Sequence, residues 1–194
     1  MKSIEEKGRF RIEPLTYSRW HDFEKLFGER GACGGCWCMW WRLKRSEFNQ
    51  QKGEGNKEAM RKLVESGRVP GLLAYDTSEP VGWISVAPRE EFLALERSRI
   101  LKPVDDKAVW SVVCFFVDKH YRGKGITVRL LEGAKEYVRR NGGAILEGYP
   151  VDPENERSPD VFVYTGLANA FKKAGFSEVA HRSKTRPIMR YELS

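Results

Sequence analysis

Residues 109–117 form one apolar stretch, interrupted only by Ser111, which constrains the fold more than any other segment of the chain. Its odd and even positions are both apolar, whereas a strand with one face in water alternates apolar and polar residues. The stretch is far shorter than the ~20 residues that a membrane-spanning helix requires. We therefore predict a central β-strand that other elements cover on both faces.

The rest of the chain supplies the elements that such a strand needs. Apolar residues at helical spacing predict helices over residues 16–27, 56–67, 126–140 and 166–174, with Thr16 and Asn56 as N-caps. Compact apolar runs predict further strands over residues 10–15, 71–75, 81–87, 144–149, 176–181 and 187–192, with a hairpin turn over 76–80. This order predicts an α/β (α+β) fold around a mixed, mostly antiparallel sheet.

Length and charge limit the classes of protein to consider. At about 150 residues per domain, 194 residues favour a single domain over residues 1–194. The formal net charge of +7 is spread over the chain without a long basic block, which indicates a solvated surface and no nucleic-acid-binding arm. The N-terminal residues lack the apolar core of a signal peptide. We expect a cytoplasmic protein without membrane contact, with its cysteines as thiols.

A glycine-punctuated loop, residues 118–127, joins the central strand to the next helix. Unpaired backbone N–H groups at a helix start attract anions, and Arg122 and Lys124 add positive charge. The loop therefore indicates a phosphate site, although an ordinary glycine turn is the alternative interpretation. A Walker A loop is excluded because Asp118 stands where its first glycine belongs, and the dinucleotide fingerprint is excluded because Val128 replaces its last glycine.

The loop resembles a known motif. Arg122-Gly123-Lys124-Gly125-Ile126-Thr127 is similar to the pyrophosphate-binding sequence Gln/Arg-x-x-Gly-x-Gly/Ala of the GNAT superfamily of acyl-CoA-dependent N-acyltransferases. Thr127 replaces the last Gly or Ala but keeps the backbone N–H that the family uses. Phe171, four positions before Gly175-Phe176, resembles the second landmark of the family. The resemblance covers nearly the whole chain and implies a GNAT-like domain with a splayed strand pair and helices on both faces of the sheet.

The resemblance implies a co-substrate and its binding residues. Acetyl-CoA would insert its pantetheine arm where the central strand parts from its neighbour, after Phe116-Val117, and the backbone N–H of Val117 would polarise the thioester carbonyl. An amine of a small molecule or peptide would attack directly, and no metal is expected. The residues that the resemblance assigns to the coenzyme are Phe116, Val117, Arg122, Gly123, Lys124, Gly125, Ile126, Thr127 and Phe171.

The acid and the base of the reaction are less clear, because Phe171 stands where the family usually has its proton-donating tyrosine. Tyr164 or Tyr149 would then donate the proton, or no acid is needed. The central strand holds no carboxylate, so Glu147 on the next strand is the preferred base. A salt-bridged surface glutamate is the alternative interpretation of this residue.

Residues 33–42 combine three cysteines with three tryptophans after a glycine-rich break. The resemblance implies that this segment walls the acceptor site, with the acceptor contacted by Trp37, Cys38, Trp40, Trp83 and Ser85. Simple packing, a redox-sensing dithiol and structural zinc are the alternatives. Zinc needs four ligands, and only Cys114 and His21 are candidates for the one that is missing.

Two other functions stay open at this point. Phe171 and the lack of a strand carboxylate are compatible with an acyl-CoA-binding protein of weak or no catalysis. Aromatic residues with positive charge are compatible with a basic nucleic-acid or regulatory interaction module, although we expect no nucleic acid as a partner. The resemblance also makes a homodimer an expectation, because many such folds pair.

Overall fold

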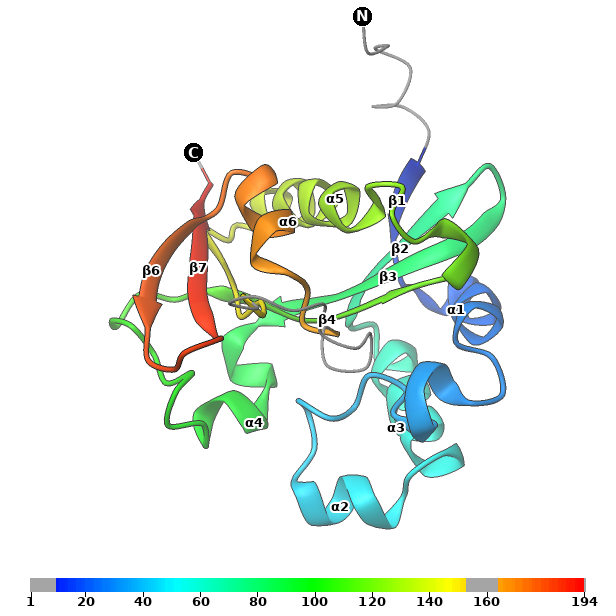
Figure 1. Ribbon diagram of the computed structural model, residues 1–194. Coiled ribbons are helices and arrows are strands. Elements are labelled where there is room, and N and C mark those ends of the chain that lie inside the picture. The colour runs from blue at the N-terminus through cyan, green and yellow to red at the C-terminus, as the bar shows by residue number, and fades with distance from the viewer. Residues whose placement is uncertain (1–9, 153–163, 194) are drawn as a thin grey trace, which may run out of the picture.

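A seven-stranded sheet forms the centre of the computed structural model, which describes residues 10–152 and 164–193 (Figure 1). Neighbouring strands follow the order β1-β2-β3-β4-β5-β7-β6, and only β4 and β5 pair in parallel. The middle position of β4 confirms the predicted central strand and the mixed, mostly antiparallel sheet. The strands are β1 (Phe10–Pro14), β2 (Gly71–Asp76), β3 (Glu79–Pro88), β4 (Trp110–Val117), β5 (Ile145–Gly148), β6 (Ser177–His181) and β7 (Pro187–Glu192).

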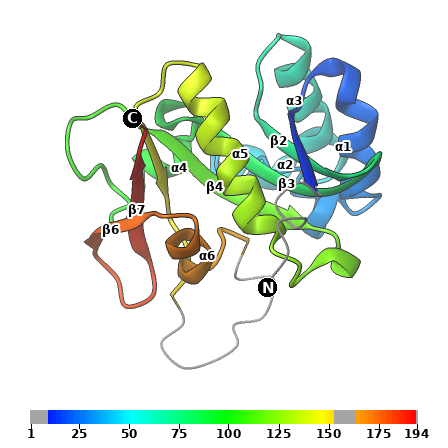
Figure 2. The same cartoon turned by 90° about the horizontal axis from the view of Figure 1, so that it is seen from above.

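Helices cover both faces of this sheet, as predicted. The helices are α1 (Trp20–Phe27), α2 (Arg45–Gln50), α3 (Glu54–Glu65), α4 (Leu93–Glu96), α5 (Ile126–Arg140) and α6 (Ala168–Lys173). Figure 1 shows α5 and α6 on one face and α1, α3, α2 and α4 on the other. Seen from above in Figure 2, α5 crosses the middle strands while α6 lies beside it over the half of the sheet that holds β5, β7 and β6. Within the described residues, no helix is long and apolar enough to span a membrane.

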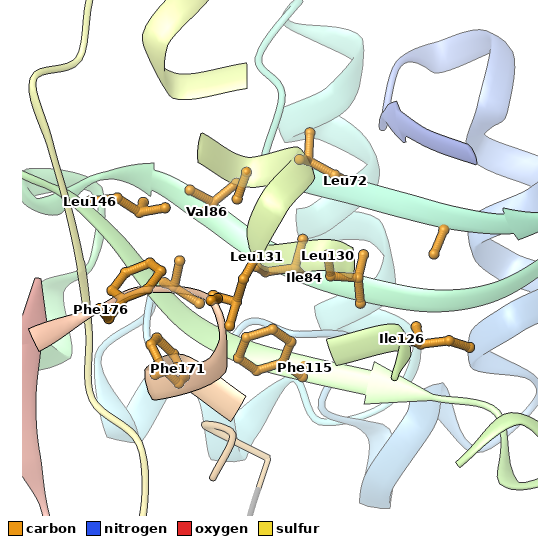
Figure 3. Packing of buried hydrophobic residues seen from close by; sticks show 14 of the residues in the cluster. Leu72, Ile84, Val86, Phe115, Ile126, Leu130, Leu131, Leu146, Phe171 and Phe176 are labelled. Carbon is orange, nitrogen blue, oxygen red and sulfur yellow. The ribbon is translucent and has the colours of Figure 1, made fainter. Parts of the chain in front are cut away.

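The two-sided burial of β2 shows how the layers form. Leu72 and Ala74 point into the core under α5, and Leu73 and Tyr75 point into the core under α1 and α3. Because successive side chains of a strand point to opposite faces, an unbroken apolar run fits only a strand covered on both sides. Figure 3 shows the first of these cores, in which side chains of α5 and α6 pack on β2, β3 and β4.

β4 and β5 part after a short parallel pairing. Their register covers Trp110 to Val112 of β4 against Leu146 to Gly148 of β5. Immediately afterwards Val113 is an extra residue, because Ser85 of β3 pairs with Cys114 while the next residue of β3 pairs with Val112. Such a bulge bends a strand and ends regular pairing. The predicted splayed strand pair is therefore present, but the two strands part after Val112 and not after Phe116-Val117 as expected, because the bulge at Val113 ends the pairing earlier.

Both predicted helix caps are wrong. Thr16 precedes a 3-10 turn, Tyr17–Arg19, and its side chain makes no capping hydrogen bond. Asn56 lies inside α3, whose N-cap is Gly53. The buried Asn56 amide instead donates to the carbonyl oxygen of Gly35 at 3.0 Å, so this side chain holds the irregular turn Gly31–Gly35 against α3.

The boundaries of the short elements also differ from the prediction. The turn between β2 and β3 is tighter than expected, and Thr77 in it takes a left-handed φ of 58°. The sequence did not indicate α2 or α4, because helices of one or two turns are too short to show an apolar period. Both helices lie on the face of the sheet that also carries α1 and α3 (Figure 1).

Candidate active site

A cavity of about 860 Å³ connects three parts of the fold. Its first wall is the loop before α5 together with the first turn of that helix, including Gly123, Gly125 and Thr127. The second is the gap beyond the closed end of β4 and β5, where residues 114–117 face Tyr164 and Gly166. The third, the cysteine wall, is the segment from Ala32 to Phe48 on the opposite side of the sheet, which includes Cys33, Cys36 and Cys38. Loop, splayed strands and cysteine-rich segment thus share one space.

The loop before α5 has the geometry of an anion site. Gly123 and Gly125 adopt left-handed φ values of 75° and 77°, and Gly125 is the N-cap of α5. A Cβ atom at either glycine would meet nothing within 4 Å, so the backbone conformation and not the space requires glycine. The Asp118 side chain accepts the backbone N–H of His120 at 2.8 Å, which shapes the start of the loop. The start of α5 therefore lies open to the cavity, where a helix favours negative charge.

All four cysteines of the chain line this cavity. Cys33, Cys36 and Cys38 come from the irregular segment before α2, and Cys114 comes from β4 just beyond the bulge. All are free thiols, and the described part of the chain contains no group of three or more His, Cys, Asp or Glu side chains placed to hold a metal ion.

Cys38 is the most buried of the four and lies in an unusual backbone conformation. It is 2% exposed, and its Sγ accepts the indole N–H of Trp83 at 3.2 Å. Trp37 and Cys38 have φ values of 47° and 60°, which cost energy for residues with a Cβ atom. Strain of this kind persists only where surrounding contacts hold it, and it gathers at functional sites.

The surroundings of Cys38 favour its charged form. Burial by itself would raise the pKa of this thiol. Hydrogen bonds from the side chains of Cys114 and Trp83 reverse that effect, and the pKa falls to about 7. A hydrogen bond from Ser85 and the positive charge of Arg42 act in the same direction. The pKa of Cys38 therefore lies below that of an ordinary thiol.

The neighbouring thiols keep their protons. The hydrogen bond to Cys38 and the burial of its own side chain raise the pKa of Cys114 well above the ordinary value of a thiol. Burial, with the charge of Cys38, raises the pKa of Cys36 to about 11. The cluster thus places one cysteine of lowered pKa beside two cysteines of raised pKa.

Tyr164 also lines the cavity. Its backbone carbonyl accepts the N–H of Phe115 at 2.6 Å, so the chain at Tyr164 lies beside β4 in the gap. Burial raises the pKa of its phenol, while the nearby Arg186 lowers it. The net rise keeps this phenol protonated at neutral pH, as a proton donor must be.

The structure does not bring Glu147 to the cavity. Its Oε2 accepts Arg190 Nε at 2.6 Å, and its Oε1 accepts the Tyr149 hydroxyl at 2.6 Å and Arg89 Nη1 at 3.3 Å. Its side chain is 1% exposed. Tyr149 also accepts from Arg89 and shares a hydrogen bond with Ser111. Glu147 is therefore salt-bridged, as the alternative interpretation expected, but it is buried and not at the surface, and both of its oxygens are already used by buried partners.

The other predicted site residues divide into two groups. Those that line the cavity are Cys38, Trp40, Phe116, Val117, Arg122, Gly123, Gly125, Ile126, Thr127 and Tyr164. The lining does not include Trp37, Trp83, Ser85, Lys124 or Phe171. Trp37, Trp83 and Ser85 are buried in the interior of the protein. Lys124 instead packs on an aromatic ring, with its Nζ 4.7 Å from the centre of the Tyr121 ring.

Phe171 lies in the core under α6 instead of in the cavity. Its ring packs edge-to-face against Phe115 at 6.0 Å and Phe176 at 5.0 Å, as Figure 3 shows. A Cβ atom at Gly148 would lie 2.2 Å from this ring, so the glycine makes room for it. Cys33, Cys36 and Cys114 also line the cavity, although the sequence does not predict them as site residues. That all are cysteines could have pointed to a common site. Their spacing could not, because Cys114 is far from the other three in the sequence.

Comparisons with known proteins agree with this geometry. A sequence model described as the acetyltransferase (GNAT) family matches residues 37–166. The PaiA N-acetyltransferase of Thermoplasma acidophilum, solved with coenzyme A, has a TM-score of 0.53 and 15% identity over 94% of this chain and 98% of its own. A GNAT-family acetyltransferase of Listeria monocytogenes has a TM-score of 0.57 and 8% identity over 95% of both chains.

The name of a third similar protein states what that protein acetylates. The ribosomal-protein-S5-alanine acetyltransferase of Vibrio fischeri has a TM-score of 0.51 and 15% identity over 95% of this chain and 93% of its own. At such low sequence identities, these structural similarities show only that the fold is shared. A comparison with curated protein sequences found no match.

Proposed function

Because the chain belongs to the acetyltransferase (GNAT) family and is thus an acyltransferase, we propose that it transfers the acetyl group of acetyl-CoA to an amine of a small molecule or peptide. One observation carries this proposal: a single cavity joins the anion site before α5 to the gap between β4 and β5 and to the cysteine wall. Similar proteins have been solved with coenzyme A, and one acts on an alanine of a ribosomal protein.

Each of the three walls of the cavity would bind a different part of the reactants. The loop of Gly123 and Gly125 would bind the pyrophosphate through backbone N–H groups at the start of α5, with Arg122 nearby. The edge of β4 from Phe116 to Val117 would hold the pantetheine arm, since the N–H of Phe115 already donates to the Tyr164 carbonyl. The backbone N–H of Val117 would then polarise the thioester carbonyl, as the resemblance implies. The acceptor amine would enter from the cysteine wall.

The family membership supports an enzyme over the acyl-CoA-binding and nucleic-acid-binding alternatives. Thermal unfolding with added coenzyme A tests the binding step, since a ligand at 100 times its dissociation constant stabilises the folded state by about 2.7 kcal/mol. Oligonucleotides at the same concentration should give no such shift. Acetylation across a panel of amines then tests the transfer. The predictions of a homodimer and of a cytoplasmic location stay predictions.

Gly125→Ala is expected to weaken coenzyme A binding about tenfold or more. An alanine at a left-handed φ of 77° costs about 1–2 kcal/mol, and relief of this strain turns N–H groups away from the phosphates. Each such charge-assisted hydrogen bond is worth about 1.5–3 kcal/mol. Isothermal titration with coenzyme A measures the change.

Gly142→Ala is the matched control for this variant. Gly142 follows the other end of α5, also has a φ of 77°, and also has nothing within 4 Å of an added Cβ atom. Both variants should lose similar stability, but only Gly125→Ala should lose affinity. Equal affinities in the two variants would show that the loop does not bind the phosphates.

Tyr164→Phe is expected to lower kcat about 10²-fold while leaving coenzyme A affinity unchanged, because it removes the protonated hydroxyl beside the gap and nothing from the loop. The expected effect lies at the low end for a general acid, since a thiol of pKa ~8.5 is already an acceptable leaving group. Steady-state kinetics and titration with coenzyme A measure the two quantities. An unchanged kcat would show that the Tyr164 hydroxyl does not act as the acid of the transfer.

A further inference from the structure

A small cavity of about 230 Å³ lies beside the large one of about 860 Å³. Its volume is below the ~300–1,000 Å³ of a cavity that holds a whole ligand. Trp40 of the cysteine wall lines both cavities. The small cavity is therefore suited to one side chain of a molecule whose other end lies in the large cavity.

The connection between β3 and β4 forms one side of the small cavity. These strands are antiparallel neighbours that a turn of about two to five residues could join, but here residues 89–109 join them and include α4. The Ala94 N–H donates to the carbonyl of Trp41 at 3.1 Å, and the guanidinium of Arg42 lies 4.5 Å from the centre of the Phe92 ring. These contacts hold α4 against the cysteine wall, on the face that also carries α2 (Figure 1), so the small cavity is built into the fold.

The lining of the small cavity combines apolar side chains with hydrogen-bond donors. Its apolar members are Trp40, Leu43, Leu93 and Ala94, and its donors are Arg45, Arg97 and Ser98. Among the described residues that line it there is no carboxylate. The apolar members suit the methylene groups of an acidic side chain, and the two guanidinium groups suit its carboxylate.

The three donors of this lining are available to a bound anion. Neither Arg45 nor Arg97 forms an ion pair with another described residue, and both are exposed. The guanidinium of Arg45 lies 5.5 Å from the centre of the Trp40 ring, which holds it over the wall that the two cavities share. The Ser98 Oγ accepts the N–H of Leu101 at 3.1 Å, which leaves its own O–H to donate.

The carboxylates near these arginines have other partners. Glu91 accepts Arg42 Nη1 at 2.7 Å, and Glu96 Oε1 lies 3.4 Å from Arg89 Nε. The remaining carboxylates of α2 and of the connection do not line the small cavity. Within the part of the chain that the structure describes, the positive charge of this cavity is therefore left to a bound molecule.

We propose that the acceptor is a peptide whose N-terminal amine enters the large cavity and whose acidic side chain, on one of the next few residues, binds between Arg45 and Arg97 in the small cavity. This proposal rests on the proposed function and names the class of its acceptor. An extended peptide advances ~3.3 Å per residue, so a few residues are enough to pass Trp40. The amine still attacks the thioester directly, and the small cavity selects and orients the acceptor.

The lining of the large cavity favours the N-terminal amine of a peptide over a lysine side chain. Among its described residues there is no carboxylate and no histidine that could remove a proton from the amine. An N-terminal amine has an ordinary pKa of ~8, whereas that of a lysine amine is ~10.4. The N-terminal amine is therefore neutral far more often at neutral pH, and it can attack without a strong base.

Matched peptides test the preference on the unmodified protein. Hexapeptides that differ only in Glu, Gln or Lys at one of positions 2 to 5, each made with several first residues, are acetylated at saturating acetyl-CoA, and the released coenzyme A is measured. We expect Glu at one position to lower KM about tenfold relative to Gln, and Lys to raise it. Added salt should reduce the difference, because the two arginines are exposed.

Variants assign the preference to the small cavity. Arg97→Gln should raise the KM of the Glu peptide about 3- to 5-fold and leave that of the Gln peptide and the affinity for coenzyme A unchanged. Arg45→Gln should act in the same direction, although it also removes the contact with Trp40. Arg97→Glu should make the Lys peptide the better acceptor. Arg99→Gln is the matched control, because Arg99 is an exposed arginine of the same connection that does not line the cavity.

The outcomes separate this inference from the proposed function. Equal KM values for the Glu and Gln peptides, or acetylation of small amines and of no hexapeptide, would overturn the inference and leave the proposed function intact. A preference for Glu that Arg97→Gln and Arg99→Gln change equally would also overturn it. A protein that coenzyme A does not stabilise would fail at the proposed function, and the inference would fail with it. A preference for Glu that Arg97→Gln reduces and Arg99→Gln does not would support both.

Discussion

Glu147→Ala is expected to lower the free energy of unfolding by about 3–5 kcal/mol, because the carboxylate is the partner of two buried arginines. Arg89 and Arg190 have side chains that are 9% and 8% exposed, so neither can turn to water when its partner is removed. Arg190 would keep Asp105 at 2.7 Å, while the Arg89 guanidinium would lose its closest buried carboxylate. Urea unfolding of the two proteins measures the difference.

Glu136→Ala is the matched control for this loss. Glu136 on α5 also pairs with two arginines, Arg139 and Arg140, but its side chain is 41% exposed. Water replaces its partners, so we expect a change of less than about 1 kcal/mol. Equal losses at Glu136 and Glu147 would mean that burial does not decide the strength of the Glu147 network.

The conservative variant addresses the sequence-based prediction that Glu147 is the catalytic base. Glu147→Gln keeps the shape of the side chain and removes the negative charge. A structural glutamate outside the cavity predicts a less stable protein whose acetyl transfer has an unchanged pH–rate profile. A profile that loses its low-pH limb, where an essential base becomes protonated, would instead support the base.

The sequence predicted the centre of the fold because local patterns determine it. The apolar run of β4 and the amphipathic spacing of α5 each lie within one element, and the predicted bounds 126–140 match α5 fully. Gly123 and Gly125 were recognisable because a left-handed start of a helix favours glycine. The caps failed because Asn56 has a stronger partner, the Gly35 carbonyl, that is far away in sequence.

The candidate site was harder to predict because its contacts join distant segments. Both faces of β4 are apolar, so the pattern could not show that Cys114 points to the cysteine wall, and the bulge at Val113 resets the alternation. Glu147 finds Arg89 and Arg190 at separations of 58 and 43 residues. No local pattern distinguishes such a buried ion pair from a catalytic carboxylate.

Trp83→Phe is expected to raise the midpoint pH for the reaction of Cys38 with iodoacetamide by about 1–2 pH units. The indole N–H donates to the sulfur at 3.2 Å and so stabilises the charged form. A hydrogen bond to a charged group is worth about 1.5–3 kcal/mol, and one pKa unit corresponds to about 1.4 kcal/mol. Removing the donor therefore raises the pKa and lowers the thiolate fraction at neutral pH.

Phenylalanine is chosen because Trp83 also fills the core. Its ring lies 4.8 Å from that of Phe23 and 6.0 Å from that of Phe27, and it is fully buried. Trp83→Ala would remove this packing as well and cost about 3–5 kcal/mol, which would mix an electrostatic effect with a loss of structure. Trp83→Phe keeps an aromatic ring at the position, so the pH dependence of alkylation reports mainly on the lost donor.

Trp41→Phe is the matched control, because Trp41 is also buried but its indole nitrogen has no hydrogen-bond partner among the described residues. Peptide mass spectrometry resolves the alkylation of Cys38 from that of the other three cysteines. The hydrogen bond from Cys114 and the charge of Arg42 are present in both variants, so they cannot produce a difference between them. The same midpoint for Trp83→Phe and Trp41→Phe would show that Trp83 does not hold the thiolate, and the charge on Cys38 would then depend on Cys114, Ser85 and Arg42.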